Sequence, residues 1–151
     1  MAKFRLTSES ISWLGRTLFR IKAECDFGSV KKGDNGGFVE KEDNLSQDGN
    51  AWVYGNARVS GDALVSGNAW VYGDASVSPI NIIGLRYPVT ITDQHMLIGC
   101  EFHLISEWRE FEGRRIAQMD GRASTRFWTA HKSTLLGICD SERPQAKAEA
   151  V

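Results

Sequence analysis

Hydrophobic and polar positions repeat with a period of six between residues 49 and 78. Five consecutive hexads have the form Gly-(Asn/Asp)-Ala-x-Val-x, and they read GNAWVY, GNARVS, GDALVS, GNAWVY and GDASVS. Because successive side chains of a strand point to opposite faces, the Ala and the Val of each hexad share one side, which is predicted to face a core. Glycine followed by Asn or Asp readily adopts positive φ, so a bend is predicted after every short strand. Short strands joined by regular bends form a solenoid.

The phrase GNAWVY occurs twice in this repeat, at an offset of 18 residues. The hexads resemble those of the left-handed parallel β-helix proteins, in which three hexads of roughly 18 residues form one triangular coil. The resemblance implies that residue n lies beside residue n+18, one strand spacing away. We therefore expect Trp52 to lie beside Trp70 and Tyr54 beside Tyr72.

The segments on both sides of the repeat are predicted to cap it, because so few hexads cannot bury a core alone. Val39 and Leu45 precede the first hexad in steps of six, so the repeat is expected to span residues 39–78, before Pro79. Residues 1–38 alternate around a turn near Gly15 and are expected to form a β-hairpin cap. The glycine-rich stretch 33–37 is interpreted as a turn, because it lacks the Gly-Lys-Ser/Thr ending of a phosphate-binding loop.

Residues 79–140 are predicted to form a β-hairpin and helices, and residues 141–151 a flexible tail. The two strands, PVTITD and HMLIGC, flank Asp93 and Gln94. A first helix face is predicted from Ile105, Trp108 and Phe111, and a second, with Asp120 as its N-cap, from Ala123, Phe127, Ala130, Thr134 and Ile138. The predicted fold class is mostly β with C-terminal helices: a short left-handed parallel β-helix (hexapeptide solenoid) capped by an N-terminal β-hairpin and by a C-terminal hairpin plus helices.

Several phrases outside the hexads carry a second resemblance. They are LFRIKA, DFGSVKKGDNGGFVEKEDNLS and ITDQHMLIGCEFHLISEWREF, followed later by the pair Phe127-Trp128. Together with the hexads they resemble, over most of the chain, the hexapeptide-repeat proteins encoded by tailed phages and enterobacterial prophages. That group does not imply one activity. It implies an accessory protein that acts in the cytoplasm of an infected or lysogenic bacterium.

Composition and charge exclude several classes of protein. The chain has 42% hydrophobic and 25% charged residues and a formal net charge of -1, as expected of a folded soluble protein. Positive and negative charges balance in residues 1–48 and in residues 79–151, which argues against nucleic-acid binding. No apolar run is long enough for a membrane span. Cys25, Cys100 and Cys139 have no paired spacing, which favours free thiols and a reducing, cytoplasmic location.

The residues that could serve as catalytic bases or metal ligands lie outside the hexads. Some proteins with hexapeptide repeats are acyltransferases that resemble one another in using a histidine base near a cleft between subunits. Here His95, His103 and His131 all follow the repeat, and each is interpreted as a surface or hydrogen-bonded imidazole. Cys100 and His103 have the spacing of a metal-ligand pair, but no second pair completes a zinc site. We therefore expect no enzyme activity, no metal and no cofactor.

The side of the hexads opposite the predicted core carries large aromatic residues. Trp52, Tyr54, Trp70 and Tyr72 should form one outer face, with Arg58 nearby, and a monomer is not expected to leave such a face in water. Three explanations stay open for what covers it: the chain's own caps, other copies in a homo-oligomer, for which a trimer is favoured, or a planar anionic ligand such as a nucleotide. The last two are compatible.

These observations lead to a hypothesis of function. The protein is expected to be a phage-encoded, non-catalytic, oligomeric binding protein that counters host defence by sequestering a nucleotide-like immune signal at an aromatic cleft between subunits. The alternative is a protein-interaction or structural module that binds and blocks a host defence protein. Acyl-CoA-dependent acyl transfer is the third possibility.

Overall fold

The computed structural model describes residues 2–144 and 146. The chain divides into two compact units, Met1–Asn81 and Ile82–Val151. The first unit therefore contains both the expected N-terminal cap and the expected repeat. β7 (Ile80–Ile82) spans the division between the units.

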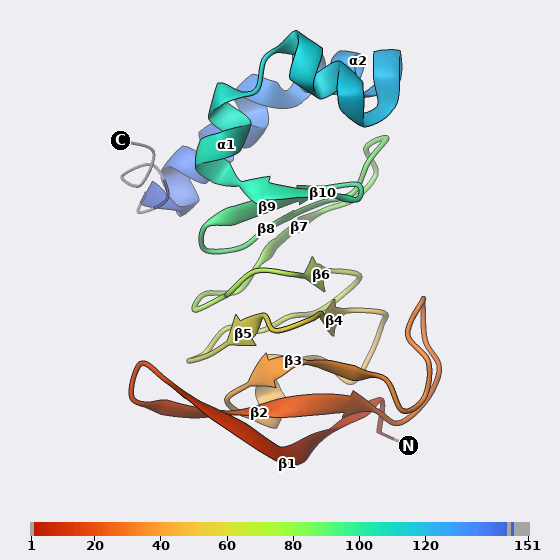
Figure 1. Ribbon diagram of the computed structural model, residues 1–151, viewed down its shortest axis with the longest axis vertical. Helices are drawn as coiled ribbons and strands as arrows, with labels where there is room; N and C mark the ends of the chain where they lie inside the picture. Colours follow the sequence, from red (N-terminus) through yellow and green to blue (C-terminus); the bar gives the residue numbers. More distant parts are fainter. Residues whose placement is uncertain (1, 145, 147–151) are drawn as a thin grey trace. The chain divides into compact units, whose positions relative to one another are not determined.

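The N-terminal unit begins with the β-hairpin expected from the sequence. β1 (Phe4–Trp13) and β2 (Arg16–Ala23) pair in antiparallel fashion (Figure 1). The connecting residues Leu14 and Gly15 both have positive φ, 49° and 77°. Positive φ at both central positions is typical of the two-residue turn that matches the twist of a hairpin. The predicted turn near Gly15 is confirmed.

A third strand joins this hairpin to the repeat. β3 (Asn35–Val39) pairs antiparallel with β2 and parallel with β5 (Arg58–Val59), so the sheet order is β1-β2-β3-β5. The predicted turn over residues 33–37 is therefore wrong for its second half, because Gly36 and Gly37 lie inside β3 and are buried. Only glycine fits there: a Cβ on Gly37 would lie 2.5 Å from the carbonyl oxygen of Ala57. These glycines serve close packing of two backbones.

The two copies of GNAWVY lie side by side, as the repeat predicts. β4 (Trp52–Val53) pairs in parallel with β6 (Trp70–Val71), and Trp52 is opposite Trp70. The Trp52 N–H donates to the Ala69 carbonyl at 3.1 Å, and the Tyr54 N–H to the Val71 carbonyl at 2.8 Å. The bends occur at glycines with φ between 59° and 71°, namely Gly49, Gly55, Gly61 and Gly67.

The offset of 18 residues does not hold on every side of the repeat. Val39 lies opposite Val59 and Leu45 opposite Val65, an offset of 20, whereas Val59 lies opposite Ala75, an offset of 16. Each departure from 18 is an even number of residues. Because side chains alternate with period two, an even shift keeps the same residues facing inward.

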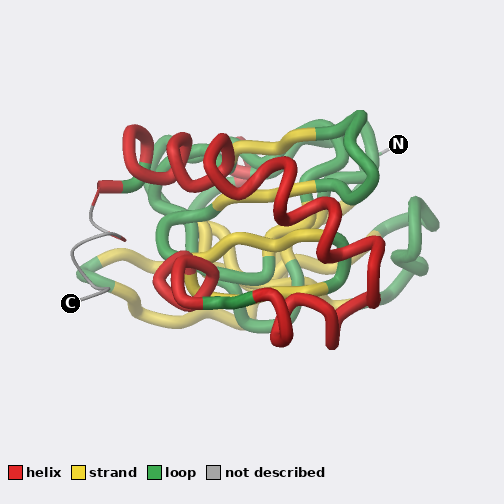
Figure 2. Tube along the Cα trace, turned by 90° about the horizontal axis from the view of Figure 1, so that it is seen from above, coloured by secondary structure: helices red, strands yellow, loops and turns green. Residues whose placement is uncertain are grey.

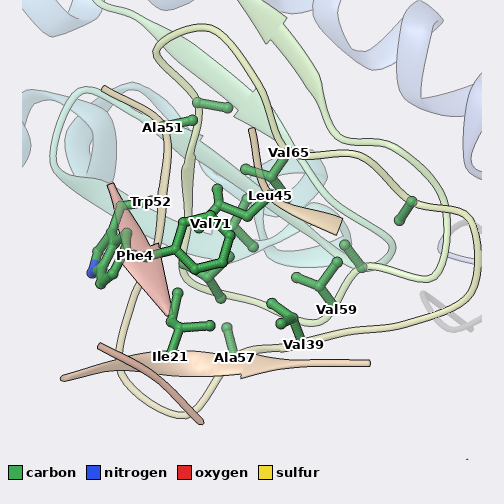
Figure 3. Packing of buried hydrophobic residues seen from close by; sticks show 14 of the residues in the cluster. Phe4, Ile21, Val39, Leu45, Ala51, Trp52, Ala57, Val59, Val65 and Val71 are labelled. Atoms are coloured by element: carbon green, nitrogen blue, oxygen red, sulfur yellow. The ribbon is translucent and has the colours of Figure 1, made fainter. Parts of the chain in front are cut away.

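The inward face of the repeat forms the core of the N-terminal unit. Every Ala and Val of the first four hexads is at most 4% exposed, and Figure 3 shows Val59, Val65 and Val71 among the packed side chains. The fifth hexad departs from the prediction, because its Val77 is 46% exposed. A short 3-10 helix, η1 (Glu42–Asn44), contacts the bend that begins at Gly61. Its buried Asn44 amide donates to the carbonyls of Gly61 and Ala63 at 3.1 and 2.8 Å.

Glu40, directly after β3, ties the hairpin to a bend of the repeat. Its carboxylate accepts a hydrogen bond from the Gly61 N–H at 2.7 Å and forms an ion pair with the Arg16 guanidinium at 2.8 Å. The Gly61 hydrogen bond is the larger cause that lowers the pKa of Glu40, and the Arg16 hydrogen bond and charge add to it. A lowered folded-state pKa stabilises the protein above the unfolded-state pKa, and this contribution is lost as the pH falls through the folded-state value.

We therefore expect Glu40→Gln to lower the urea midpoint at neutral pH and to converge with the wild type in acid. Arg16→Ala removes only the ion pair, so most of the pH dependence should remain in that variant. The measurement is a series of urea denaturation curves across the acidic range. A Glu40→Gln deficit that is constant with pH would contradict the expectation.

The hairpin of the C-terminal unit was predicted, whereas β10 (Glu101–Leu104) and β7 were not. β8 (Val89–Ile91) and β9 (His95–Ile98) pair antiparallel around Asp93 and Gln94, and β10 adds to β9. α1 (Ile105–Glu110) follows directly, with Ile105 and Trp108 buried. The predicted face of this first helix is therefore confirmed at these two positions.

The second helical segment, α2 (Gly113–Glu142), is broken near the position that the sequence suggested. Asp120 and Gly121 have non-helical backbone angles, and Figure 2 shows the helical trace changing direction along its length. The Asp120 carboxylate accepts a hydrogen bond from the Tyr87 hydroxyl, while the Asp120 N–H donates to Ser124 Oγ at 3.1 Å.

The predicted apolar face of α2 was partly wrong. Phe127 is buried as expected, but Ala130 and Thr134 are exposed. The buried stripe instead runs through Ser124, Trp128, Leu135 and Cys139. The adjacent Phe127 and Trp128 both carry large rings that can pack inward. Because Trp128 is buried as well, the buried face of the helix follows the positions in line with Trp128 and not those in line with Phe127.

Part of the expected flexible tail is ordered. Ser141 and Glu142 belong to α2, and the buried Arg143 donates from Nε to the Thr92 carbonyl at 3.0 Å. Within the predicted tail, residue 145 and residues 147–151 lie outside the described residues. Among residues 2–144 and 146, none of the helices has the length and apolar character needed to cross a membrane.

Candidate binding surface

Trp52 is not on an open surface, contrary to the prediction. Its side chain is 1% exposed and belongs to the core cluster. Phe27 meets its ring edge-on at 5.2 Å between centroids, and Phe4 does so at 6.4 Å. The strand β1 and the loop after β2 thus cover Trp52, which answers the open question for this residue in favour of the chain's own cap.

Lys3 holds the same cover in place. Its ammonium donates to the Ala51 carbonyl at 2.8 Å and lies 4.9 Å from the centroid of the Phe27 ring. Burial lowers the pKa of Lys3, and the nearby Asp48 opposes that shift. No local pattern could indicate this cover, because Lys3 and Ala51 are 48 residues apart.

The remaining three predicted aromatic residues form a surface that we call the aromatic face: Tyr54, Trp70 and Tyr72. The rings of Tyr54 and Tyr72 are stacked, 4.6 Å apart and inclined by 6°, as the repeat predicts for neighbouring coils. Tyr54 is half-buried, and its hydroxyl lies 3.3 Å from Ser29 Oγ. Trp70 and Tyr72 are 37% and 42% exposed. Side chains with this mixture of apolar ring and polar tip are enriched at protein interfaces.

Arg58 does not contribute a free charge to the aromatic face. Its guanidinium lies 3.4 Å from the centroid of the Trp13 ring and pairs with Asp74, with Nη2 to Oδ2 at 2.7 Å and Nε to Oδ1 at 3.1 Å. The Asp74 hydrogen bond is the main cause that raises the pKa of Arg58. The expected role of Arg58, a charge-assisted bond to an anionic ligand, would require breaking this bidentate pair.

Asp74 and Trp13 were missed in the sequence because neither stands at the expected offset from Arg58. Asp74 follows Arg58 by 16 residues, the same shortened offset that places Val59 opposite Ala75. A strict period of 18 therefore hides the pair. Trp13 comes from β1, and its contact with Arg58 depends on how the hairpin packs on the repeat.

The three histidines make separate contacts with aromatic rings of the C-terminal unit. His95 stacks on Phe102, His103 meets Trp108 and Phe111 edge-on, and His131 lies beside Phe127. In addition, His103 Nε2 is 2.8 Å from Glu101 Oε1. Within the described part of the chain, no group of three or more His, Cys, Asp or Glu side chains is placed to hold a metal ion. The three thiols are free, Cys100 exposed and Cys139 buried.

Comparison with known proteins identifies the repeat. Residues 51–67 and residues 57–73 each match the YdcK β-solenoid repeat. No curated protein matches the chain. The matched residues include β4, β5 and β6 and carry the aromatic face. The chain is therefore a β-solenoid repeat protein, mostly β with a C-terminal helical segment.

Proposed function

We propose that the protein is a non-catalytic binding protein whose repeat associates with other protein surfaces through the aromatic face. The observation that carries the proposal is the exposure of Trp70 and Tyr72 on a unit that buries the equivalent Trp52. Each large aromatic ring can bury roughly 150–250 Å² of surface, so leaving two of them in water is costly. Tyr and Trp are also the residues that most often dominate the energy of an interface.

The favoured partner is a second copy of the chain. The protein has a formal net charge of -1, so its copies repel one another little. A stable interface needs about 800 Å² from each partner, so the aromatic face would form only the centre of the contact. Polar residues beside it, such as Ser29, would form the rim. A trimer is the favoured assembly, because proteins that these hexads resemble commonly associate with their solenoids side by side.

The finer features of the proposal rest on the resemblances. The parallel pairing of Trp52 with Trp70, 18 residues apart, supports a parallel β-helix built of hexapeptide repeats, and the resemblance of the hexads adds its left hand. The similarity of the flanks to phage and prophage hexapeptide-repeat proteins supports a counter-defence role in the bacterial cytoplasm. In that setting, the aromatic face would also be suited to covering a host defence protein.

Sequestration of a nucleotide-like immune signal between subunits is the second candidate function. The stacked rings of Tyr54 and Tyr72 favour it, because a flat aromatic surface can stack on a base. The pairing of Arg58 with Asp74 weighs against it, since the expected cation is already engaged. For this reason protein association is placed before ligand sequestration.

Solution mass tests the leading proposal. The wild type is expected to be oligomeric at micromolar concentration, and the Trp70→Ser and Tyr72→Ser exchanges are each expected to weaken association by about 30-fold or more, the range of an interface hot spot. Leu64→Ser is the matched control. Leu64 is 44% exposed in the same repeat but lies outside the aromatic face, so the solution mass of this variant should equal that of the wild type. A wild type that stays monomeric at about 100 μM, where interfaces of standard size are populated, would rule out self-association.

Thermal stability in the presence of nucleotides tests the second candidate. Cyclic and linear nucleotides should raise the melting temperature of the wild type but not of the Tyr72→Ser variant, because a ligand that binds only the folded state stabilises it. If no nucleotide raises the melting temperature, the sequestration hypothesis fails while the association proposal stands.

A further inference from the structure

A hollow in the C-terminal unit lies beside the part of α2 that follows its break. Its volume is about 360 Å³, and its lining residues are Arg86, Ala123, Arg126, Phe127, Ala130 and His131. Small-molecule sites in proteins usually have volumes of about 300–1,000 Å³. The hollow therefore has room for a compound the size of a substituted ring. It is separate from the aromatic face, which belongs to the other unit.

The charged and titratable side chains that line the hollow are all basic. Arg86 and Arg126 are exposed, and His131 is half-buried. Among residues 2–144 and 146, neither arginine forms an ion pair with a carboxylate. A hydrogen bond with the Tyr87 hydroxyl is the first cause that raises the pKa of Arg86, and the charge of Asp120 is the smallest one. Positive charge therefore gathers at the hollow without a carboxylate to balance it.

The helical neighbours of Arg126 supply no counter-charge either. The residues three and four positions before it are Ala123 and Arg122, and those three and four positions after it are Thr129 and Ala130. Side chains at these spacings are neighbours on a helix, and like charges four positions apart repel each other. A bound anion would relieve the repulsion between Arg122 and Arg126.

A chain of ring contacts places Arg86 and His131 on either side of Phe127. The Arg86 guanidinium lies 5.6 Å from the centroid of the Tyr87 ring, and Tyr87 meets Phe127 edge-on at 5.1 Å. The rings of Phe127 and His131 are 4.7 Å apart. Basic groups from the loop before β8 and from α2 thus converge on an apolar ring. The small side chains of Ala123 and Ala130 leave the surface beside that ring open.

The number of donors favours a phosphate ester over a carboxylate. A single guanidinium can satisfy both oxygens of a carboxylate through two parallel hydrogen bonds. A phosphate monoester has three terminal oxygens and about two negative charges at neutral pH. Arg86, Arg126 and His131 together can engage all three oxygens. The apolar surface between them suits a carbon group attached to the phosphate.

We propose that this hollow binds a small phosphate monoester, with its phosphate held by Arg86 and Arg126 beside His131. The organic group of the ligand packs over Phe127, Ala123 and Ala130. This inference goes beyond the proposed function, because it assigns a ligand to the C-terminal unit and uses none of the residues of the aromatic face.

Three compounds test the proposal on the full-length wild type, by isothermal titration calorimetry at low ionic strength. Phenyl phosphate carries both parts of the ligand, inorganic phosphate lacks the ring, and benzoate replaces the phosphate by a carboxylate. We expect phenyl phosphate to bind with a Kd below about 1 mM and the other two to bind at least about tenfold more weakly. Absence of phenyl phosphate binding below about 1 mM would overturn the proposal. Equal binding of benzoate would overturn the preference for phosphate, and equal binding of inorganic phosphate would overturn the role of the apolar surface.

Single exchanges of arginine separate a built site from general attraction between charges. Arg126→Gln and Arg86→Gln should each weaken phenyl phosphate binding about tenfold, the effect of losing one charge-assisted hydrogen bond. Arg114→Gln is the matched control, because Arg114 is exposed on α2 before the break and lines a different hollow, with Glu110 and Glu112. It removes the same charge and should leave the affinity unchanged. Equal losses in all three variants, or no loss in Arg126→Gln, would overturn the proposal.

Nuclear magnetic resonance of the imidazoles locates the bound compound. The chain has three histidines, so each imidazole C–H resonance can be assigned from one His→Gln variant. Phenyl phosphate should shift the resonance of His131 and leave those of His95 and His103 in place. An unshifted His131 resonance would overturn the proposed site. The Tyr72→Ser variant should bind phenyl phosphate as the wild type does, which separates this site from the nucleotide hypothesis at the aromatic face.

Discussion

Replacing Trp52 by alanine is expected to lower the free energy of unfolding of the N-terminal unit by about 3–5 kcal/mol, the usual cost of emptying a buried aromatic site. The same replacement at Trp70 is expected to cost less than about 1 kcal/mol, because surface substitutions rarely cost more. The two residues occupy the same position of two identical hexads and differ in what covers them. Trp52 is 1% exposed beneath Phe4 and Phe27, whereas Trp70 is 37% exposed.

Urea denaturation followed by far-ultraviolet circular dichroism measures this difference without relying on tryptophan fluorescence. Because the chain has two compact units, the transition of each unit should be fitted separately if the two do not coincide. Equal losses for the two variants would mean that Trp70 is as well covered in solution as Trp52. That outcome at a concentration where the wild type is monomeric would contradict the structure.

Gly37→Ala is expected to destabilise the N-terminal unit by about 3 kcal/mol, the upper end of overpacking costs. The added Cβ would lie 2.5 Å from the Ala57 carbonyl oxygen and 2.7 Å from Val53 Cγ1. The backbone cannot easily move away, because the neighbouring Phe38 N–H donates to that same Ala57 carbonyl at 2.9 Å. The substitution therefore strains the contact that joins β3 to the repeat.

Gly137→Ala is the matched control for this exchange. Gly137 lies within α2, and a Cβ added there meets no atom within 4 Å. Alanine is a better helix former than glycine, so a gain of up to about 1 kcal/mol in the C-terminal unit is expected. A neutral Gly37→Ala variant, with its melting temperature equal to that of the wild type, would show that β3 does not pack on the repeat as described.

The inward side of the repeat could be predicted from the sequence because it depends on local geometry. Alternation along a strand places Ala51 and Val53 on one side whatever the rest of the chain does. Positive φ at glycine is equally local, and it is found at the bends of the first four hexads. Val77 was predicted wrongly: it is 46% exposed although Ala75 of the same hexad is buried opposite Val59, and no residue within that hexad signals the difference.

The candidate site could be predicted only in part. The stacking of Tyr54 on Tyr72 follows from the repeat itself and was expected. The burial of Trp52 depends on Phe4 and Phe27. Arg58 is held by contacts with Trp13 and Asp74. These partners lie on other segments of the chain. Two identical hexads therefore carry one structural and one exposed tryptophan.

The repeat, its inward face, the N-terminal hairpin and the presence of a C-terminal hairpin and helices could all be predicted, because each follows from periodicity and turn chemistry over a few residues. Packing between distant segments decides which outer residues are covered, where the register of the repeat changes, and that Tyr87, Trp108 and Trp128 line one pocket. The physical reason is that burial depends on contacts between segments distant in sequence, and such contacts leave no local pattern.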